Sequence, residues 1–323
     1  MIENKPNLFI VGQPKSGTSA LFSFLKKHHD ISVCDTKEPQ YFCKDLKSQY
    51  FHLSRKDRTD TEYLKLFPNK TRRYLLEGST AYLYSSTAAE EIYKFNPDAK
   101  IIMMFREPVD FLYTYHKQLL RNSCLFETVD DFETALNLEE DRKLGKQLPK
   151  GVFDKQFLFY SDRVKFCRQV EMFRKYFPDS QIKMLIYDDF KSDNEAVFND
   201  VLDFLELEKL GQQNFGEVNK QVEVRNRALK QFLDKHFFPV KAFLKSAIGK
   251  KTYRRLRDAY RKIIFSSKPI ERLSREKIDS LKYRYLEDVQ EFSEYIGRDL
   301  VSEWGYSHCL NQGRSLEKKS VMS

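Results

Sequence analysis

Two glycines and a lysine near the N-terminus have a spacing that can bind phosphate. Gly12 and Gly17 enclose four residues, as the glycines of a Walker A loop do. Thr18 stands where that loop carries its lysine, and Lys15 lies inside the loop instead. Backbone N–H groups at the start of a helix can still surround an anionic group. The sequence therefore predicts phosphate binding in which an ammonium group can reach the bridging oxygen of a leaving group.

The displaced lysine makes a metal-dependent kinase or ATPase the weaker interpretation. In a Walker A loop the lysine contacts the terminal phosphates beside magnesium. No acidic residue follows the second strand-like run in a clear Walker B context. The five cysteines and six histidines also lack the spacings of zinc or other metal sites. We therefore expect a nucleotide site that works with no metal ion.

Apolar runs that alternate with helical patterns predict the elements that position this loop. The strand-like runs are 8–12, 74–79, 100–105 and 182–187. The helical patterns are 87–95, 108–121, 130–137, 162–176 and 194–205. This alternation predicts an α/β fold with a P-loop NTPase-like central parallel β-sheet flanked by helices, and ligands at the carboxyl ends of the strands.

Length and composition favour one domain. The 323 residues are 41% hydrophobic, and we expect the domain to span 1–310, with a flexible tail at 311–323. A basic, aromatic helical segment is predicted at about 225–268. A last helix is predicted at 274–296, where Gly297 ends it.

The formal charge of +9 favours anionic partners. No nucleic-acid-binding motif accompanies it, so we expect no nucleic acid. Three explanations of the basic segment stay open: binding of an acidic acceptor, contact with an anionic membrane that presents a lipid-linked acceptor, and solubility. No apolar run of 18 residues and no signal-peptide pattern occur, so we expect a cytoplasmic protein, with the inner membrane surface as a peripheral alternative. The oligomeric state stays unknown.

Two motifs, taken together, resemble those of a known family. "PKSGTSAL" at 14–21 resembles the 5′-phosphosulfate loop of the sulfotransferases that use 3′-phosphoadenosine 5′-phosphosulfate (PAPS). "FREPVDFLYTY" at 105–115 resembles their 3′-phosphate motif, in which a hydroxyl residue follows the arginine by eight positions. The two motifs occur in order, about ninety residues apart, and the resemblance covers most of the chain. It is nearest to the glycan/heparan-type branch.

The resemblance implies roles for single residues. Lys15 would stabilise the bridging oxygen as adenosine 3′,5′-bisphosphate (PAP) departs. Arg106 and Thr114 would bind the 3′-phosphate, which PAPS has and ATP lacks. In the predicted elements Arg106 ends a strand, Pro108 begins a helix and Thr114 lies two turns along it, so both side chains can reach one phosphate. The 5′-phosphate would be held by Lys15, Ser16, Gly17, Thr18 and Ser19.

The resemblance also suggests the general base. "DTKEPQYF" at 35–42 resembles the segment whose glutamate deprotonates the acceptor hydroxyl, which makes Glu38 the candidate. His116 and His52 are weaker rivals, and Glu77 could contact substrate or hold a loop. The glycan branch often has lysine after the glutamate at position 77, where this chain has Gly78. Lys37 or another basic group is a possible substitute.

We therefore interpret the chain as a PAPS-dependent sulfotransferase. It would move a sulfuryl group to an acceptor hydroxyl on a glycan, a lipid or a small metabolite. The alternatives are a P-loop kinase or other NTP-dependent enzyme, and a non-catalytic basic protein that binds acidic glycans.

Overall fold

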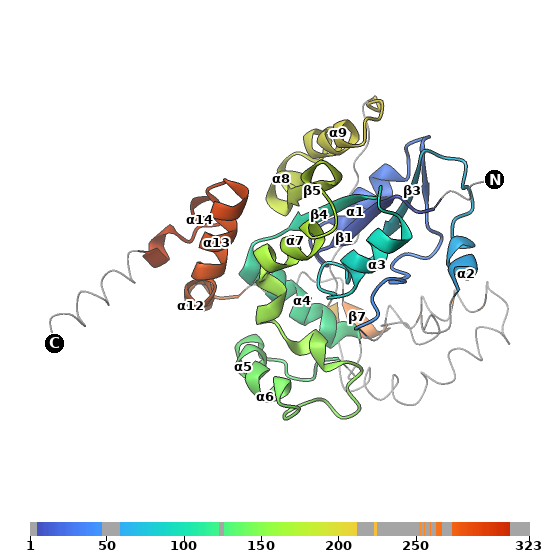
Figure 1. The fold of residues 1–323 in the computed structure, drawn as a ribbon. Coiled ribbons are helices and arrows are strands. Elements are labelled where there is room, and N and C mark those ends of the chain that lie inside the picture. Colours follow the sequence, from blue (N-terminus) through green and yellow to red (C-terminus); the bar gives the residue numbers. More distant parts are fainter. Residues whose placement is uncertain are drawn as a thin grey trace, which may run out of the picture. The chain divides into compact units, whose positions relative to one another are not determined.

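A parallel sheet of five strands forms the centre of the computed structural model (Figure 1). The structure describes residues 5–46, 59–122, 126–211 and 273–310, together with positions 223–224 and a few positions from 252 to 266. The strand order is β2-β3-β1-β4-β5, and every pairing in this sheet is parallel. The strands are β1 (Leu8–Gly12), β2 (Ile31–Val33), β3 (Tyr74–Gly78), β4 (Lys100–Phe105) and β5 (Ile182–Ile186).

The chain divides into two compact units. The first comprises Met1–Leu112, Ser161–Asn219 and Arg275–Ser323, and it contains the sheet. The second comprises Tyr113–Tyr160 and Lys220–Ser274. The expectation of one domain over 1–310 stays a prediction.

Helices cover both faces of the sheet, which explains why its strands are mostly apolar and largely buried (Figure 1). On one face Leu8 and Ile10 share a buried cluster with residues of α1 (Thr18–Leu25), α8 (Tyr187–Ser192) and α9 (Asn194–Phe204). On the other face Phe9 contacts Phe42, which in turn contacts Phe95 of α3 (Ala88–Phe95). Helix α7 (Phe166–Arg174) packs against α3.

The predicted helices occur in the structure, apart from two breaks. The pattern at 162–176 is a 3-10 turn, η4 (Ser161–Val164), followed by α7. The last helix is in fact two, α12 (Arg275–Arg284) and α13 (Leu286–Ile296), because Tyr285 has non-helical φ and ψ of −109° and 12°. Gly297 ends α13 with a φ of 66°, as predicted. The remaining helices are α2 (Asp60–Leu64), α4 (Pro108–Asn122), α5 (Phe132–Asn137), α6 (Glu139–Lys143) and α14 (Leu300–Glu303), with 3-10 turns at η3 (Lys155–Leu158), η4 (Ser161–Val164) and η5 (Asp179–Gln181).

Buried polar side chains hold the second unit together. Arg142 donates to both carboxylate oxygens of Glu127, at 2.8 and 2.9 Å, and neither side chain is exposed. The Tyr160 hydroxyl donates to the same carboxylate at 2.8 Å. His116 uses one ring nitrogen on the Tyr160 hydroxyl and the other on the Asp130 carbonyl. His116 is therefore a buried structural residue rather than the general base.

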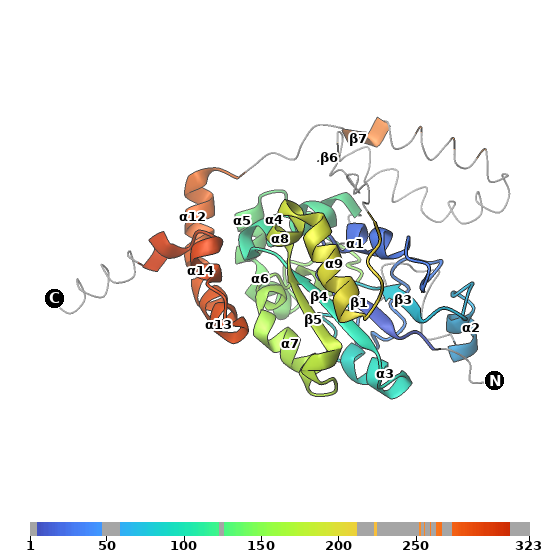
Figure 2. The same ribbon diagram turned by 90° about the horizontal axis from the view of Figure 1, so that it is seen from above.

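Several predicted features fall outside the described residues. The tail at 311–323 and His52 lie wholly outside them, and most of the basic segment at 225–268 does too. Within that segment the structure shows β7 (Phe265–Ser266), which pairs antiparallel with β6 (Glu223–Val224), just before the segment (Figure 2). No helix in the described part of the chain has the length and apolar character that a membrane span requires.

Candidate functional site

The predicted phosphate-binding loop joins β1 to α1, at the carboxyl end of the central strand. Gln13 anchors the loop: its backbone N–H donates to the Met104 carbonyl at 2.8 Å, and its side-chain oxygen accepts the Arg106 N–H at 3.2 Å. Gly17 has a φ of 83°, and a Cβ there would lie 3.0 Å from Phe190. The loop is thus held against β4, with Thr18 as the first residue of α1.

Three non-glycine residues at this edge adopt left-handed backbone conformations. They are Lys15, Glu38 and Gln40, with φ of 66°, 57° and 50°. Such conformations cost free energy, and they cluster where a side chain must be held in one orientation. Both residues predicted to carry the chemistry, Lys15 and Glu38, belong to this group.

Arg106 connects the two predicted nucleotide motifs. It follows β4 directly, and its guanidinium donates to the Lys15 carbonyl at 2.6 Å. Two further bonds, at 2.8 and 2.5 Å, go to the Asp110 carboxylate one helical turn later. The guanidinium also lies 4.6 Å from the centre of the Tyr187 ring. Its side chain is only 9% exposed, so its orientation is fixed by these contacts.

The predicted loop hydroxyls have different surroundings. Ser16 is fully buried, and its hydroxyl donates to the Gln13 side chain at 3.4 Å. Ser16 can therefore offer an anion its backbone N–H more readily than its side chain. Thr18 is also buried, whereas Ser19 is partly exposed and accepts a hydrogen bond from the Lys37 ammonium group.

Glu38 lies beside the end of β3. Its backbone N–H donates to the Gly78 carbonyl at 3.1 Å, and its carboxylate lies 3.9 Å from the Lys37 ammonium group. Burial raises the pKa of Glu38 above its ordinary value, and the Lys37 charge and a hydrogen bond with Thr80 offset part of that rise. A carboxylate whose pKa lies above the usual range is a better proton acceptor.

Lys37 is a residue whose position the sequence alone did not establish. Its ammonium group donates to Ser19 at the start of α1 and lies close to Glu38, so it connects the loop with the candidate base. Burial lowers the pKa of Lys37, although the neighbouring Glu38 carboxylate opposes that shift. The signal in the sequence was its place directly before Glu38.

Glu77 holds a loop rather than a substrate. It is completely buried in β3, and its carboxylate accepts hydrogen bonds from Tyr63 and, at 3.1 Å, from Tyr82. The Tyr82 hydroxyl in turn accepts the Phe42 N–H at 3.3 Å. These bonds, together with one from the Gln40 N–H to Ser79 at 2.8 Å, fasten the segment that follows Glu38.

Gly78 has no room for a side chain, which accounts for the missing lysine. A Cβ at this position would lie 2.9 Å from the Phe22 ring of α1. Replacing Gly78 by alanine is therefore expected to lower the free energy of unfolding by about 1–3 kcal/mol, because Phe22 must move within a packed core. Urea-induced unfolding measures the change.

Gly211→Ala is the matched control, since no atom of the described residues lies within 4 Å of a Cβ built there. Equal stability of the Gly78→Ala and Gly211→Ala proteins would contradict the steric explanation of the missing lysine.

Thr114 is placed in the second unit. It lies on α4, eight residues after Arg106, and is buried. Its role at the 3′-phosphate stays a prediction from the resemblance.

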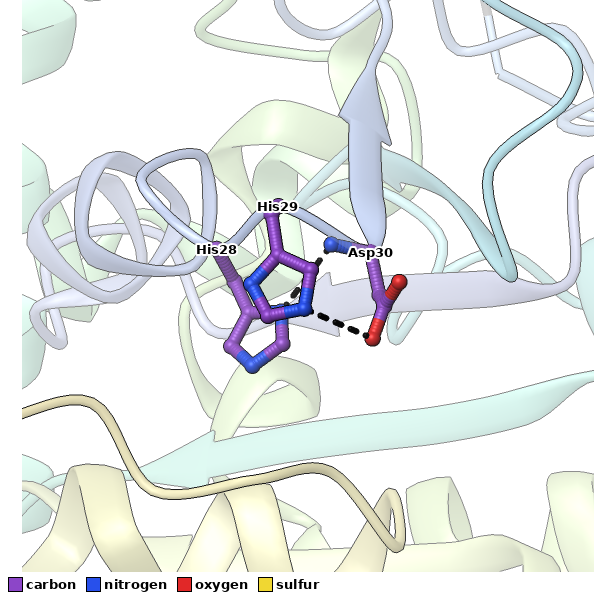
Figure 3. Close-up of side chains that lie close together, drawn as sticks. All are labelled: His28, His29 and Asp30. Carbon is purple, nitrogen blue, oxygen red and sulfur yellow. Dashed lines mark hydrogen bonds and ion pairs between the residues drawn. The ribbon is translucent and has the colours of Figure 1, made fainter.

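One group of possible metal ligands occurs among the described residues: His28, His29 and Asp30, whose ligand atoms lie within 4.8 Å of one another (Figure 3). The Asp30 N–H donates to His28 Nδ1 at 3.1 Å, so the other ring nitrogen carries the proton and donates to the Glu208 carbonyl at 3.0 Å. His28 can therefore bind a metal only by giving up a backbone hydrogen bond. The group precedes β2, at the sheet edge opposite to the loop.

Comparisons with known proteins show which proteins this chain is similar to. The chain is 25% identical over 205 residues to human bifunctional heparan sulfate N-deacetylase/N-sulfotransferase 3, a match covering 62% of this chain and 22% of the relative. It is 24% identical over 261 residues to mouse carbohydrate sulfotransferase 15, covering 64% and 45%. The chain thus spans less than half the length of these two relatives.

A solved structure shows the same fold. The crystal structure of a sulfotransferase from Alicyclobacillus acidocaldarius has a TM-score of 0.57 and 26% sequence identity, and the match covers 77% of this chain and 99% of that one. The family described as "Sulfotransferase domain" matches residues 5–252. This protein therefore belongs to the sulfotransferase domain family.

Proposed function

We propose that the protein transfers a sulfuryl group from PAPS to an acceptor hydroxyl. The observation that carries the proposal is the bond between the Arg106 guanidinium and the Lys15 carbonyl, which fastens the predicted 3′-phosphate residue to the predicted 5′-phosphosulfate loop. PAPS carries phosphate at both the 3′ and the 5′ position of one ribose, so Arg106 and the loop would each bind one of them. ATP has no 3′-phosphate for Arg106 to bind.

The loop supplies positive charge to the leaving group. Backbone N–H groups at the start of α1 would bind the 5′-phosphate, with the Ser16, Gly17, Thr18 and Ser19 positions nearest to it. The Lys15 ammonium group would stabilise the oxygen that bridges sulfur and phosphorus while the bond between sulfur and this oxygen breaks. These donors belong to the protein, so the proposal includes no metal ion.

Glu38 would act as the general base. The acceptor oxygen forms a bond to sulfur while the bond from sulfur to the phosphate oxygen breaks, and the acceptor proton moves to the Glu38 carboxylate. PAP leaves with the electron pair of the broken bond. The raised pKa of Glu38 and its partly buried carboxylate, 19% exposed, suit this role.

Lys37 would supply the charge that the glycan branch places at position 78. That position is closed by Phe22, whereas the Lys37 ammonium group reaches both Ser19 and Glu38. It can thus neutralise the transferred sulfuryl oxygens and keep Glu38 ionised in the resting protein. The acceptor hydroxyl then meets a carboxylate that can accept its proton.

The names of the two relatives favour a carbohydrate acceptor. The net charge of +9 suits an acidic glycan or a lipid-linked glycan at a membrane surface, with lipids and small metabolites as alternatives. We place the protein in the cytoplasm, with peripheral contact at the inner membrane surface as the alternative.

Calorimetric titration with PAP and ADP in EDTA tests the donor site. We expect PAP to bind about 10- to 100-fold more tightly than ADP, because a charge-assisted hydrogen bond to the 3′-phosphate contributes about 1.5–3 kcal/mol. Arg106→Ala should remove this preference. Equal affinities in the native protein, or an absolute need for magnesium, would favour a kinase.

Transfer of radiolabelled sulfate from PAPS to fractionated glycans, lipids and metabolites then identifies the acceptor class. A protein that only binds acidic glycans would transfer no labelled sulfate to any of these fractions.

A further inference from the structure

The C-terminal segment, residues 275–310, contacts the residues on either side of Arg106 and the helix that faces its guanidinium. It lies beyond the end of the family match at residue 252, and it belongs to the first unit together with the loop and β4. Three contacts join it to the immediate neighbours of Arg106: Phe105 before it, Glu107 after it, and helix α8, which contributes the ring that the guanidinium faces.

The contact after Arg106 is a hydrogen bond from the Tyr306 hydroxyl to the Glu107 carboxylate. The same carboxylate accepts the Val109 N–H at 3.0 Å and the Asp110 N–H at 2.7 Å, so it caps the first turn of α4. Asp110 is the residue that holds the guanidinium of Arg106. Tyr306 is fully buried, so its hydroxyl fixes the Glu107 carboxylate. That carboxylate in turn orients Asp110, the ion-pair partner of Arg106.

The contact through α8 is an ion pair and a hydrogen bond. Arg298 donates to both oxygens of Asp189, at 2.5 and 2.8 Å, and the Trp304 indole N–H donates to Asp188 at 3.0 Å. These two carboxylates directly follow Tyr187, whose ring faces the Arg106 guanidinium. The segment thus holds the aromatic surface on which Arg106 rests.

The contact before Arg106 is apolar. Phe292 packs on Phe105, with ring centres 4.8 Å apart, and on Phe166 at 5.1 Å. The turn that carries Trp304 and Tyr306 is itself held, because the Lys282 ammonium group donates to the Trp304 carbonyl at 2.6 Å and to the Gly305 carbonyl at 3.2 Å. The segment can therefore transmit a fixed geometry to Arg106.

Simple coverage of an apolar core would not need these polar contacts. Burial raises the pKa of Glu107, and the hydrogen bonds from Tyr306 and from the backbone oppose that rise and favour the charged form. Burying a carboxylate is unfavourable unless it is bonded in this way. These contacts thus hold the Glu107 carboxylate and the first turn of α4, beside Arg106, in one arrangement.

We propose that the C-terminal segment positions Arg106 for the 3′-phosphate of the nucleotide, with Tyr306 as a positioning residue. This inference rests on the proposed function, because it takes Arg106 as the 3′-phosphate ligand. An arginine side chain has many rotamers, and one that is held before the nucleotide arrives loses less conformational freedom on binding. Loosening the segment should therefore weaken recognition of the 3′-phosphate alone.

The test compares the affinities for PAP and AMP, which differ by the 3′-phosphate. In Tyr306→Phe the ring stays and only the hydroxyl is lost, and we expect PAP affinity to fall about three- to tenfold, with AMP affinity unchanged. A residue that merely stabilises the fold would lower both affinities together or neither. Calorimetric competition at one temperature measures the ratio.

A second variant covers the case in which Tyr306→Phe does not fold. Asp189→Asn weakens the ion pair with Arg298 at a carboxylate that is 43% exposed, and we expect the same selective loss of PAP affinity. Its matched control is Asp200→Asn, which weakens an ion pair with Lys183 of similar exposure elsewhere in the unit. The control should leave both affinities unchanged.

Arg106→Ala separates the two proposals. If it removes the preference for PAP over AMP while Tyr306→Phe and Asp189→Asn keep it, the positioning role is wrong and the donor site stands. If Arg106→Ala itself keeps the preference, the 3′-phosphate assignment and the positioning role are both overturned.

Discussion

Replacing Glu38 by glutamine is expected to lower kcat for sulfuryl transfer by about 10²- to 10⁴-fold, the range in which a positioned general base contributes. The amide keeps the shape of the side chain and cannot accept the acceptor proton. PAP affinity should not change, because the nucleotide would be bound by the loop and by Arg106. Single-turnover transfer of labelled sulfate, measured beside PAP titration, separates the chemical step from binding.

The pH dependence of kcat/KM tests directly whether Glu38 is the general base. As the proposed base, Glu38 would act only when ionised. Burial raises its pKa, so the acidic limb of kcat/KM should lie above the pH range of an ordinary glutamate. As the pH falls through that raised pKa, Glu38 takes up a proton and the rate is lost. In Glu38→Gln the limb should disappear and a low, nearly flat rate should remain.

Glu195→Gln is the matched control, because Glu195 is exposed in the first turn of α9. It should transfer sulfate at the native rate. A Glu38→Gln protein that keeps both the rate and the acidic limb would show that another group accepts the proton.

The sheet was predictable because its strands are buried on both faces. In the strand Lys100–Phe105 the five residues after Lys100 are all apolar and buried. Such a run predicts a strand even though apolar and polar residues do not alternate. Strand β2 was not predicted, because it has only three residues and contains Ser32. The break at Tyr285 was not predicted, because Leu281, Tyr285 and Val289 keep the helical spacing through it and are all buried.

The relative positions of the candidate site residues were predictable only where a local sequence motif contains them. The loop and Arg106 follow strands directly, so their common edge follows from a parallel sheet. The contact of Lys37 with Ser19 and the closeness of Phe22 to Gly78 depend on how α1 packs against the ends of β2 and β3, which no local pattern records. The contact between Tyr306 and Glu107 joins positions 199 residues apart, and nothing in a local pattern records it.

The lysine in the loop yields the other large prediction. Lys15→Met should lower kcat by about 10²- to 10³-fold, the loss found when one donor to a developing negative charge is removed. The charge on the bridging oxygen grows as the bond to sulfur breaks, so the ammonium group binds the transition state more strongly than the substrate. The affinity for PAPS should therefore fall much less than the rate, and single-turnover kinetics at saturating PAPS measures the difference.

Lys26→Met controls for the loss of one positive charge, since Lys26 is exposed at the end of the same helix, α1. The Lys26→Met protein should transfer sulfate at the native rate. The rate of the Lys15→Met protein should rise with a donor whose leaving group is a weaker base, because such a group needs less stabilisation as it departs. An equal loss with both donors would assign Lys15 to binding alone. The left-handed backbone at Lys15, with a φ of 66°, would then hold the loop carbonyl for Arg106 rather than the ammonium group for the leaving oxygen.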